Sequence, residues 1–195
     1  MYPILSDHSP MAQFAELNRL FLRVINPLLH TGEMVSSAPG RARAETARRV
    51  LLELGPREQE QLARAPVALF RLRLEPAGLG DRVRADAWLA AESHDARMAF
   101  TVSAMLTAWH MLQTAPDWAR LGFGLSQQEL TWLAGVPLSE LPVLAVPAAE
   151  RLRPRFVQRG VFWQRVAECV ARGDREGLRL VRYTAIHLAS AEQHA

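Results

Sequence analysis

Apolar residues recur every three or four positions along most of the chain, the spacing of one face of an α-helix. Residues 11–30 predict a first helix of this kind, and Pro27 is expected to kink or end it. Residues 31–41 are rich in small residues and helix breakers, so they predict a loop. The same periodicity, bounded by Gly and Pro, predicts further helices at 43–54, 57–65, 82–114, 126–134, 137–146, 148–153, 158–171 and 174–192.

The longest predicted helix, 82–114, carries an apolar stripe that is typical of the core of a helical bundle. Pro116 is expected to end it. His110 lies on this face, where a hydrogen-bonded core histidine is the expected interpretation. The stripe contains Trp88, Met98, Val102, Met105, Leu106, Trp109 and Leu112.

One segment departs from the helical period. Residues 69–74 alternate apolar residues with arginines, which indicates a short strand or extended edge, although a helix end stays open. Six residues cannot form a sheet alone. We therefore predict an all-α protein, an irregular bundle of about seven to nine helices in a single domain covering 1–195, with a short extended segment near 69–74.

A faint internal repeat accompanies this pattern. Leu62-Ala63 and the segment 71–74 stand at the same spacing as Leu144-Ala145 and the segment 153–156, an offset of 82 residues. This spacing favours duplicated halves at 11–80 and 82–160, followed by helices within 158–192. Chance similarity in a chain rich in Ala, Leu and Arg is the alternative.

Composition adds charge to the picture. The chain has 195 residues, a formal net charge of +3 and a pI near 9.9, and all 23 basic residues are arginine. Such a bias indicates either a GC-rich genome or an affinity for anions. The N-terminus has no secretory pattern, and the longest apolar run, 98–112, is too short and polar to span a bilayer. We expect a cytoplasmic, bacterial protein without membrane contact.

The best-defined motif covers residues 124–145. Ser126 and Glu129 form a capping box, and Gly135 allows a tight turn between two short helices. Leucines on both helices predict a buried face, as in a helix-turn-helix unit. The candidate contact residues of this unit are Ser126, Gln127, Gln128, Ser139 and Glu140.

Two features weigh against DNA reading by this unit. Pro142 falls inside the second predicted helix, where an interior proline costs about 3 kcal/mol. The exposed positions Ser139, Glu140 and Val143 offer no Arg, Asn or Gln to base edges, and Glu140 repels phosphate. A helical hairpin that serves only for packing is therefore an equal alternative.

Residues 121–156 resemble the carboxy-terminal half of FlhD, the helical subunit of the flagellar master regulator. The resemblance rests on Leu121-Gly122, Leu133-Ala134, Leu144-Ala145 and the basic-aromatic segment 153–156. It implies a transcriptional co-regulator that dimerises and needs a partner subunit to bind DNA. This chain is nearly twice the length of such a subunit and has none of the partner family's zinc-binding cysteines.

A basic segment follows the motif. Nine arginines stand against three acidic residues between Arg151 and Arg182, a local net charge of +6. Arginine favours phosphate through bidentate geometry, and aromatic rings can stack on bases. Core anchoring is the alternative for the aromatic residues, and an acidic protein partner is the alternative for the arginines. The candidate binding residues are Arg151, Arg153, Arg155, Arg159, Trp163 and Arg165.

No pattern of catalytic chemistry is visible. The six histidines lack metal-ligand spacing, and Cys169 lies among helical valines, which indicates a buried filler. Gly-rich phosphate loops and nucleophile elbows are absent. We expect neither an enzyme nor a cofactor or metal.

Two functions remain in view. The first is a regulatory protein of the FlhD type that binds DNA directly or with a partner subunit, and a homodimer is one arrangement it allows. The alternative is a protein–protein adaptor or assembly factor of a bacterial secretion or motility system, which the five tryptophans favour. Replacing Arg153 and Arg155 by Ala is expected to weaken DNA binding without unfolding the protein.

Overall fold

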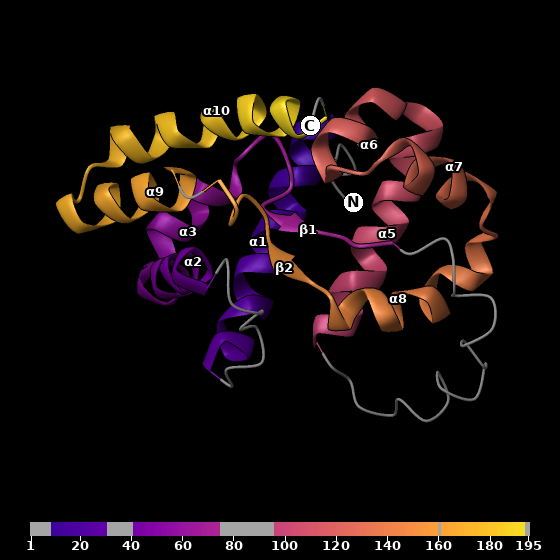
Figure 1. Ribbon diagram of the computed structural model, residues 1–195, viewed down its shortest axis with the longest axis horizontal. Coiled ribbons are helices and arrows are strands. Elements are labelled where there is room, and N and C mark those ends of the chain that lie inside the picture. The colour runs from indigo at the N-terminus through magenta and orange to yellow at the C-terminus, as the bar shows by residue number, and fades with distance from the viewer. Residues whose placement is uncertain (1–8, 31–40, 75–95, 160, 194–195) are drawn as a thin grey trace, which may run out of the picture.

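The computed structural model describes residues 9–30, 41–74, 96–159 and 161–193 (Figure 1). Nine α-helices within these ranges confirm the all-α prediction. The helices are α1 (Pro10–His30), α2 (Arg41–Glu53), α3 (Pro56–Ala63), α5 (Ala96–Thr114), α6 (Pro116–Phe123), α7 (Gln127–Gly135), α8 (Leu141–Glu150), α9 (Val161–Arg172) and α10 (Arg175–Glu192). A 3-10 turn, η2 (Leu138–Glu140), and two short strands, β1 (Phe70–Arg71) and β2 (Arg153–Pro154), complete them.

Prolines mark several helix starts. Pro56, Pro116 and Pro142 each lie in the first turn of a helix, where the missing N–H group has no partner within the helix. The expectation that Pro142 interrupts a helix is therefore wrong, because α8 begins at Leu141. Pro27 does not end α1 either, since the helix continues to His30.

The second half of the chain differs from the predicted boundaries. The segments 137–146 and 148–153 were expected as two helices, but η2 leads into one helix, α8, which contains Pro147. Helix α6 was not predicted at all. Its signals are Pro116 at the start and Gly124 at the end, where the glycine adopts a left-handed φ of 68°. The loop expected at 31–41 and the helix start expected at 82–95 lie outside the described residues, apart from Arg41 in α2.

The extended segment near 69–74 is confirmed, and its alternation has a clear structural role. Phe70, Leu72 and Leu74 are buried, whereas Arg71 and Arg73 are exposed. Strand β1 pairs with β2 in an antiparallel ladder, with Arg71 opposite Arg153 and Phe70 opposite Pro154. The ladder continues one pair further, because the Arg155 N–H donates to the Leu69 carbonyl at 2.7 Å.

Phe70 lies at the centre of a cluster of aromatic rings contributed by three helices. Its ring centroid is 5.4 Å from that of Phe21 in α1, 4.9 Å from that of Phe100 in α5 and 6.1 Å from that of Phe123 in α6. Phe14 extends the cluster with an edge contact to Phe123 at 5.1 Å. Edge-to-face pairs at these distances stabilise a core beyond their buried area. The cluster joins the two parts of the chain around β1.

The stripe predicted for the long helix is only partly a core face. Met105 is buried, and Met98, Val102, Trp109 and Leu112 are half-buried against the core. Leu106 and His110 are exposed, so the expectation of a core histidine at position 110 is wrong. Trp88 lies outside the described residues.

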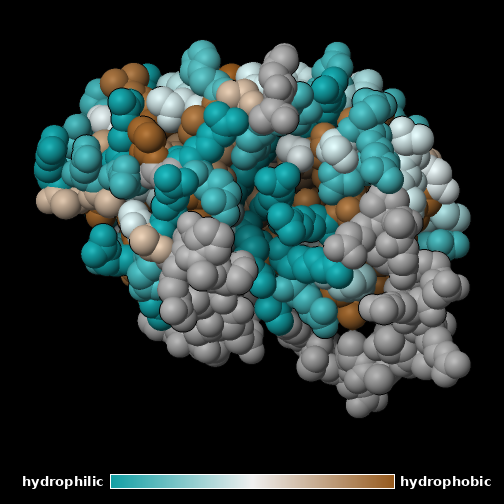
Figure 2. Space-filling model, in the orientation of Figure 1, coloured by the Kyte–Doolittle hydropathy of each residue, from teal (hydrophilic) through white to brown (hydrophobic). Residues whose placement is uncertain are grey.

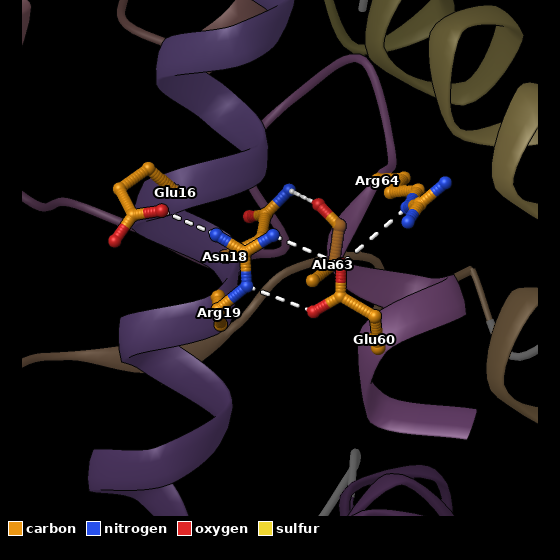
Figure 3. A network of polar contacts seen from close by, with 6 residues as sticks. All are labelled: Glu16, Asn18, Arg19, Glu60, Ala63 and Arg64. Atoms are coloured by element: carbon orange, nitrogen blue, oxygen red, sulfur yellow. Dashed lines mark hydrogen bonds and ion pairs between the residues drawn. The ribbon is translucent and has the colours of Figure 1, made fainter. Parts of the chain in front are cut away.

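A buried asparagine holds the chain that leads into β1 (Figure 3). The Asn18 side-chain amide donates to the carbonyls of Ala63, Ala65 and Val67 at 2.9–3.2 Å, and Figure 3 shows the first of these bonds. Its oxygen accepts the Leu69 N–H at 2.8 Å. Residues 64–69 follow α3 and lack helical hydrogen bonds, so Asn18 satisfies backbone groups that would otherwise be buried without partners.

Beside Asn18, an ion-pair network joins α1 to α3. Arg19 donates twice to the Glu60 carboxylate, at 2.8 and 2.9 Å, and it also contacts Glu16 (Figure 3). Arg64 adds a longer bond to Glu60 at 3.4 Å. The hydrogen bonds from Arg19 lower the pKa of Glu60 to about 2, although burial acts in the opposite direction.

The C-terminal hairpin follows the predicted boundaries closely. α9 ends at Arg172, and Gly173 adopts a left-handed φ of 63°. Asp174 then caps α10 by accepting the Gly177 N–H at 2.7 Å. The predicted stop and N-cap at 172–174 are therefore confirmed. In Figure 1 α9 and α10 run side by side, and α9 packs on α2 while α10 packs on α3 and α6.

Replacement of Asn18 by Ala is predicted to destabilise the fold by about 3 kcal/mol, because it leaves several buried backbone groups without hydrogen bonds. Urea unfolding followed by circular dichroism measures the change. The exposed Gln164→Ala on α9 is the control and should alter stability by about 0.5 kcal/mol or less. Equal effects of the two substitutions would contradict the structural role of Asn18.

Replacement of Glu60 by Gln is predicted to lower stability at neutral pH by about 0.5–1 kcal/mol, a value discounted because the Glu60 side chain is 41% exposed. The folded pKa of Glu60 is depressed from 4.5, so its contribution is present above pH 4.5 and is lost as the pH falls toward 2. Urea midpoints of the two proteins should differ at pH 7 and converge near pH 2. The exposed Glu53→Gln serves as a control, and a difference that persists at pH 2 would refute the linkage.

Candidate nucleic-acid interface

Helices α7 and α8 have the arrangement of a helix-turn-helix unit. The Ser126 hydroxyl accepts the Glu129 N–H at 3.2 Å, and the Glu129 carboxylate accepts the Ser126 N–H at 2.8 Å, which confirms the predicted capping box. The chain bends by 105° between α7 and the segment Leu138–Glu150. This angle lies in the range of about 90–120° that is typical of helix-turn-helix pairs.

The surface of α8 does not match that of a recognition helix. Its sequence contains no Arg, Asn or Gln, and Glu150 is its single exposed residue. Ser139 and Glu140 are exposed but precede the helix, in η2, while Gln127 and Gln128 are exposed in the first turn of α7. Because base edges are read by side-chain donors and acceptors, α8 lacks the groups for major-groove reading. Its buried face packs instead on α5.

The predicted basic-aromatic patch is divided by the fold. Arg155 and Trp163 are each only 1% exposed, so the expectation that they belong to a binding surface is wrong. The Arg155 guanidinium donates to the Gly122 carbonyl at 2.6 Å, to the Leu121 carbonyl at 3.2 Å and to Glu192 at 2.9 Å. The Trp163 indole N–H donates to the Arg155 carbonyl at 2.7 Å. Both residues anchor the C-terminal hairpin.

Burial lowers the pKa of Arg155, and the negative charge of Glu192 opposes that effect. The close fit extends to the backbone around it. Gly124 lies so near that an added Cβ would be 2.7 Å from the Arg155 guanidinium, and its φ of 68° already favours glycine. A side chain at position 124 would therefore collide with the buried guanidinium of Arg155. Phe156, which directly follows Arg155 in the chain, also has a positive φ of 62°.

The other predicted arginines occupy two locations. Arg159 donates to the Ala191 carbonyl at 3.1 Å, near the end of α10, and Arg165 is exposed on α9. Arg153 donates to the carbonyls of Glu150 and Leu152 at 3.0 and 2.8 Å, beside the β-ladder. Arg151 lies nearby, at the rim of a shallow depression that it shares with Arg73.

The fold therefore brings close together arginines that lie far apart in the sequence. We call Arg71, Arg73, Arg97, Arg151 and Arg153 the ladder arginines. Arg71 and Arg153 are direct partners across the ladder. The pKa of Arg153 is lowered first by burial and then by the positive charges of Arg97 and Arg73. Figure 2 shows strongly hydrophilic side chains over the centre of this face, where β1 and β2 run.

Such a group of guanidinium groups is suited to an anion. Each guanidinium offers paired N–H donors that match the oxygens of a phosphate or carboxylate. The depression between Arg73 and Arg151 is too shallow to enclose a ligand, and its lining includes the apolar side chains of Trp132 and Leu144.

Arg71, Arg73 and Arg97 were absent from the predicted site. The alternation of 69–74 carried the signal for the first two, because it places Arg71 and Arg73 together on the open face of a strand. The pairing of β1 with β2, which brings Arg153 opposite Arg71, has no local sequence signal.

Metal-binding and nucleophilic chemistry find little support in the described ranges. No three His, Cys, Asp or Glu residues there are grouped to hold a metal ion. Cys169 is half-buried, not buried as the sequence interpretation of a filler required. Burial, followed by the charges of Asp174 and Glu168, raises the pKa of its thiol, which disfavours the reactive thiolate.

In the part of the chain that the structure describes, no single helix is long and apolar enough to cross a membrane; only the bent pair Gln127–Gly135 and Leu138–Glu150 reaches that length and apolarity together.

Comparisons with known protein families, with curated protein sequences and with solved structures find no match to this chain.

Replacement of Arg155 by Ala is predicted to destabilise the protein by about 3 kcal/mol or more, because it leaves the partly buried Glu192 and two carbonyls without their cation. The sequence analysis expected replacement of Arg153 and Arg155 to leave the protein folded, and the burial of Arg155 makes that expectation wrong. Thermal unfolding followed by circular dichroism tests the prediction. Arg165→Ala is the matched control, with an expected change of about 0.5 kcal/mol or less. An unchanged unfolding temperature for Arg155→Ala would contradict the anchoring role.

Proposed function

We propose that this protein is a non-enzymatic regulatory protein of the FlhD type, which holds nucleic acid through phosphate contacts and obtains sequence selectivity from a partner subunit. The observation that carries the proposal is the group of ladder arginines, with Arg71 and Arg153 opposite each other. Each guanidinium of this group carries paired N–H donors that match the oxygens of a phosphate.

The proposal assigns positioning, not base reading, to this chain. Helix α8 has no donors for base edges, and the aromatic residues Phe156, Phe162 and Trp163 are buried in the core, where no base can stack on them. Phosphate contacts alone orient a protein on nucleic acid without specifying sequence. A second subunit would then supply the specific contacts, as the resemblance to FlhD implies.

Binding to a fluorescently labelled random-sequence duplex, measured by anisotropy at several salt concentrations, tests this function. The affinity should fall steeply with salt, because each phosphate contact releases counterions. Arg71→Ala with Arg73→Ala should weaken binding and reduce the slope of log K against log salt by about 2. Both residues are exposed, so the fold should persist.

The control is Arg165→Ala with Arg172→Ala, which removes the same charge from the exposed side of α9. Equal weakening by the two double variants would show that net charge alone governs binding. Absence of binding at low salt would sink the nucleic-acid function.

A protein–protein adaptor is the second candidate function, and one surface favours it. Leu180 and Tyr183 on α10 are 58% and 49% exposed, at a spacing that places them on the same side of the helix. Arg182 lies over the Tyr183 ring, 4.9 Å from its centroid, and holds it in place. Exposed aromatic and apolar side chains beside arginine are typical of interface hot spots. Trp163, in contrast, is a core residue and cannot serve as the contact expected from the sequence.

Replacement of Leu180 and Tyr183 by Ser is predicted to abolish capture of a protein partner while leaving helicity and melting temperature unchanged, since both side chains are exposed. Affinity capture with the purified full-length chain, followed by circular dichroism of the variant, measures both. Leu138→Ser, at an equally exposed site on η2, is the control. Retention of the partner by the double variant would exclude this face of α10.

A further inference from the structure

The described elements occur twice in the same order. Helices α1, α2 and α3 lead into β1, and helices α5, α7 and α8 lead into β2, with α6 as an addition. An offset of 82 residues carries Leu51 and Leu62 onto Leu133 and Leu144, all four of them buried. The same offset carries the end of α3 into α8 and β1 onto the start of β2.

The two long helices also repeat their buried faces. A shift of 83 residues places five buried positions of α1 on five buried positions of α5. Asn18 then falls on Thr101, and these are the two buried polar residues on the described parts of these helices. The corresponding positions are Leu17, Asn18, Phe21, Leu22 and Ile25 in α1 and Phe100, Thr101, Ala104, Met105 and Ala108 in α5.

The packing repeats as well. α1 packs on α2 and α3, and α5 packs on α7 and α8. Between the two sets, the long helices contact each other, α1 against α5, and the strands pair, β1 with β2, so these two elements each meet their own counterpart. An antiparallel ladder has local two-fold symmetry between its strands, and its register here is the one that a two-fold repeat requires. Arg153 is both the ladder partner of Arg71 and its equivalent at the offset of 82.

The C-terminal hairpin breaks this symmetry. α9 packs on α2 and α10 on α3, while the corresponding surfaces of α7 and α8 have no such cover in the described ranges. Arg73 and Arg155 are equivalent at the offset of 82, yet Arg73 is exposed and Arg155 is buried against Glu192 in α10. One copy of this arginine thus stays available to a ligand, and the other attaches the hairpin.

We infer that the chain is two copies of one helical unit fused in tandem, and that the ladder arginines, drawn from both copies around the shared two-fold axis, bind duplex nucleic acid. The inference rests on the proposed function and deepens it. The two backbones of a duplex are themselves related by two-fold axes, so each copy can face one strand. A single strand has no such axis. The site is complete within one chain, without a second protomer.

Anisotropy titrations with a random-sequence duplex and with its isolated single strand test the inference. The intact chain should bind the duplex about tenfold or more tightly than the single strand at moderate salt. Arg71→Ala with Arg73→Ala removes two cations from the first copy. Arg151→Ala with Arg153→Ala removes two from the second. Each pair should weaken duplex binding by about tenfold and lower the salt slope by about 2, whereas Arg165→Ala with Arg172→Ala should change little.

Because Arg153 donates to backbone carbonyls, circular dichroism must show native helicity for its variant. If helicity falls, Arg97→Gln with Arg151→Gln replaces it as the second-copy test. Equal affinity for both ligands, or a loss confined to one copy's variant, would overturn the duplex site while the proposed function stands. Absence of binding to either ligand would overturn both.

Discussion

The position of β1 depends on the buried side chain of Asn18. The chain between α3 and β1 is neither helix nor strand, and its backbone groups lie in the core, out of reach of water. One carboxamide satisfies two of its carbonyls, its Leu69 N–H and the carbonyl of Ala63 at the end of α3. A buried amide with all of these bonds specifies one conformation, because any other leaves polar groups unpaired at a cost of about 1–3 kcal/mol each.

From that constraint the geometry of the candidate site follows. With residues 64–69 held in place, Phe70 enters the ring cluster formed with Phe21, Phe100 and Phe123. The alternation of a strand then points Arg71 and Arg73 outward. The core and the basic surface are opposite sides of the same short segment.

Arg155 has a corresponding role in the second half of the chain. Its buried guanidinium joins the end of α6 to the last turn of α10, and its carbonyl receives the Trp163 indole. A buried charge persists only with a close counter-ion and hydrogen bonds, and this one has both. The sequence around Arg155 is as basic as that around Arg153, two residues earlier, whose side chain lies beside the ladder. The local sequence therefore could not predict which of the two arginines is buried.

The sequence by itself determined those features that depend only on residues close together in the chain. Periodicity predicted the all-α class and most helices, the capping box at Ser126 and Glu129 predicted the start of α7, and alternation predicted the two faces of 69–74. Tertiary structure decided which strand pairs with β1, which arginines become neighbours and which one is buried. The physical reason is that periodicity and capping act over one or two turns, whereas burial of Arg155 depends on Glu192, 37 residues away.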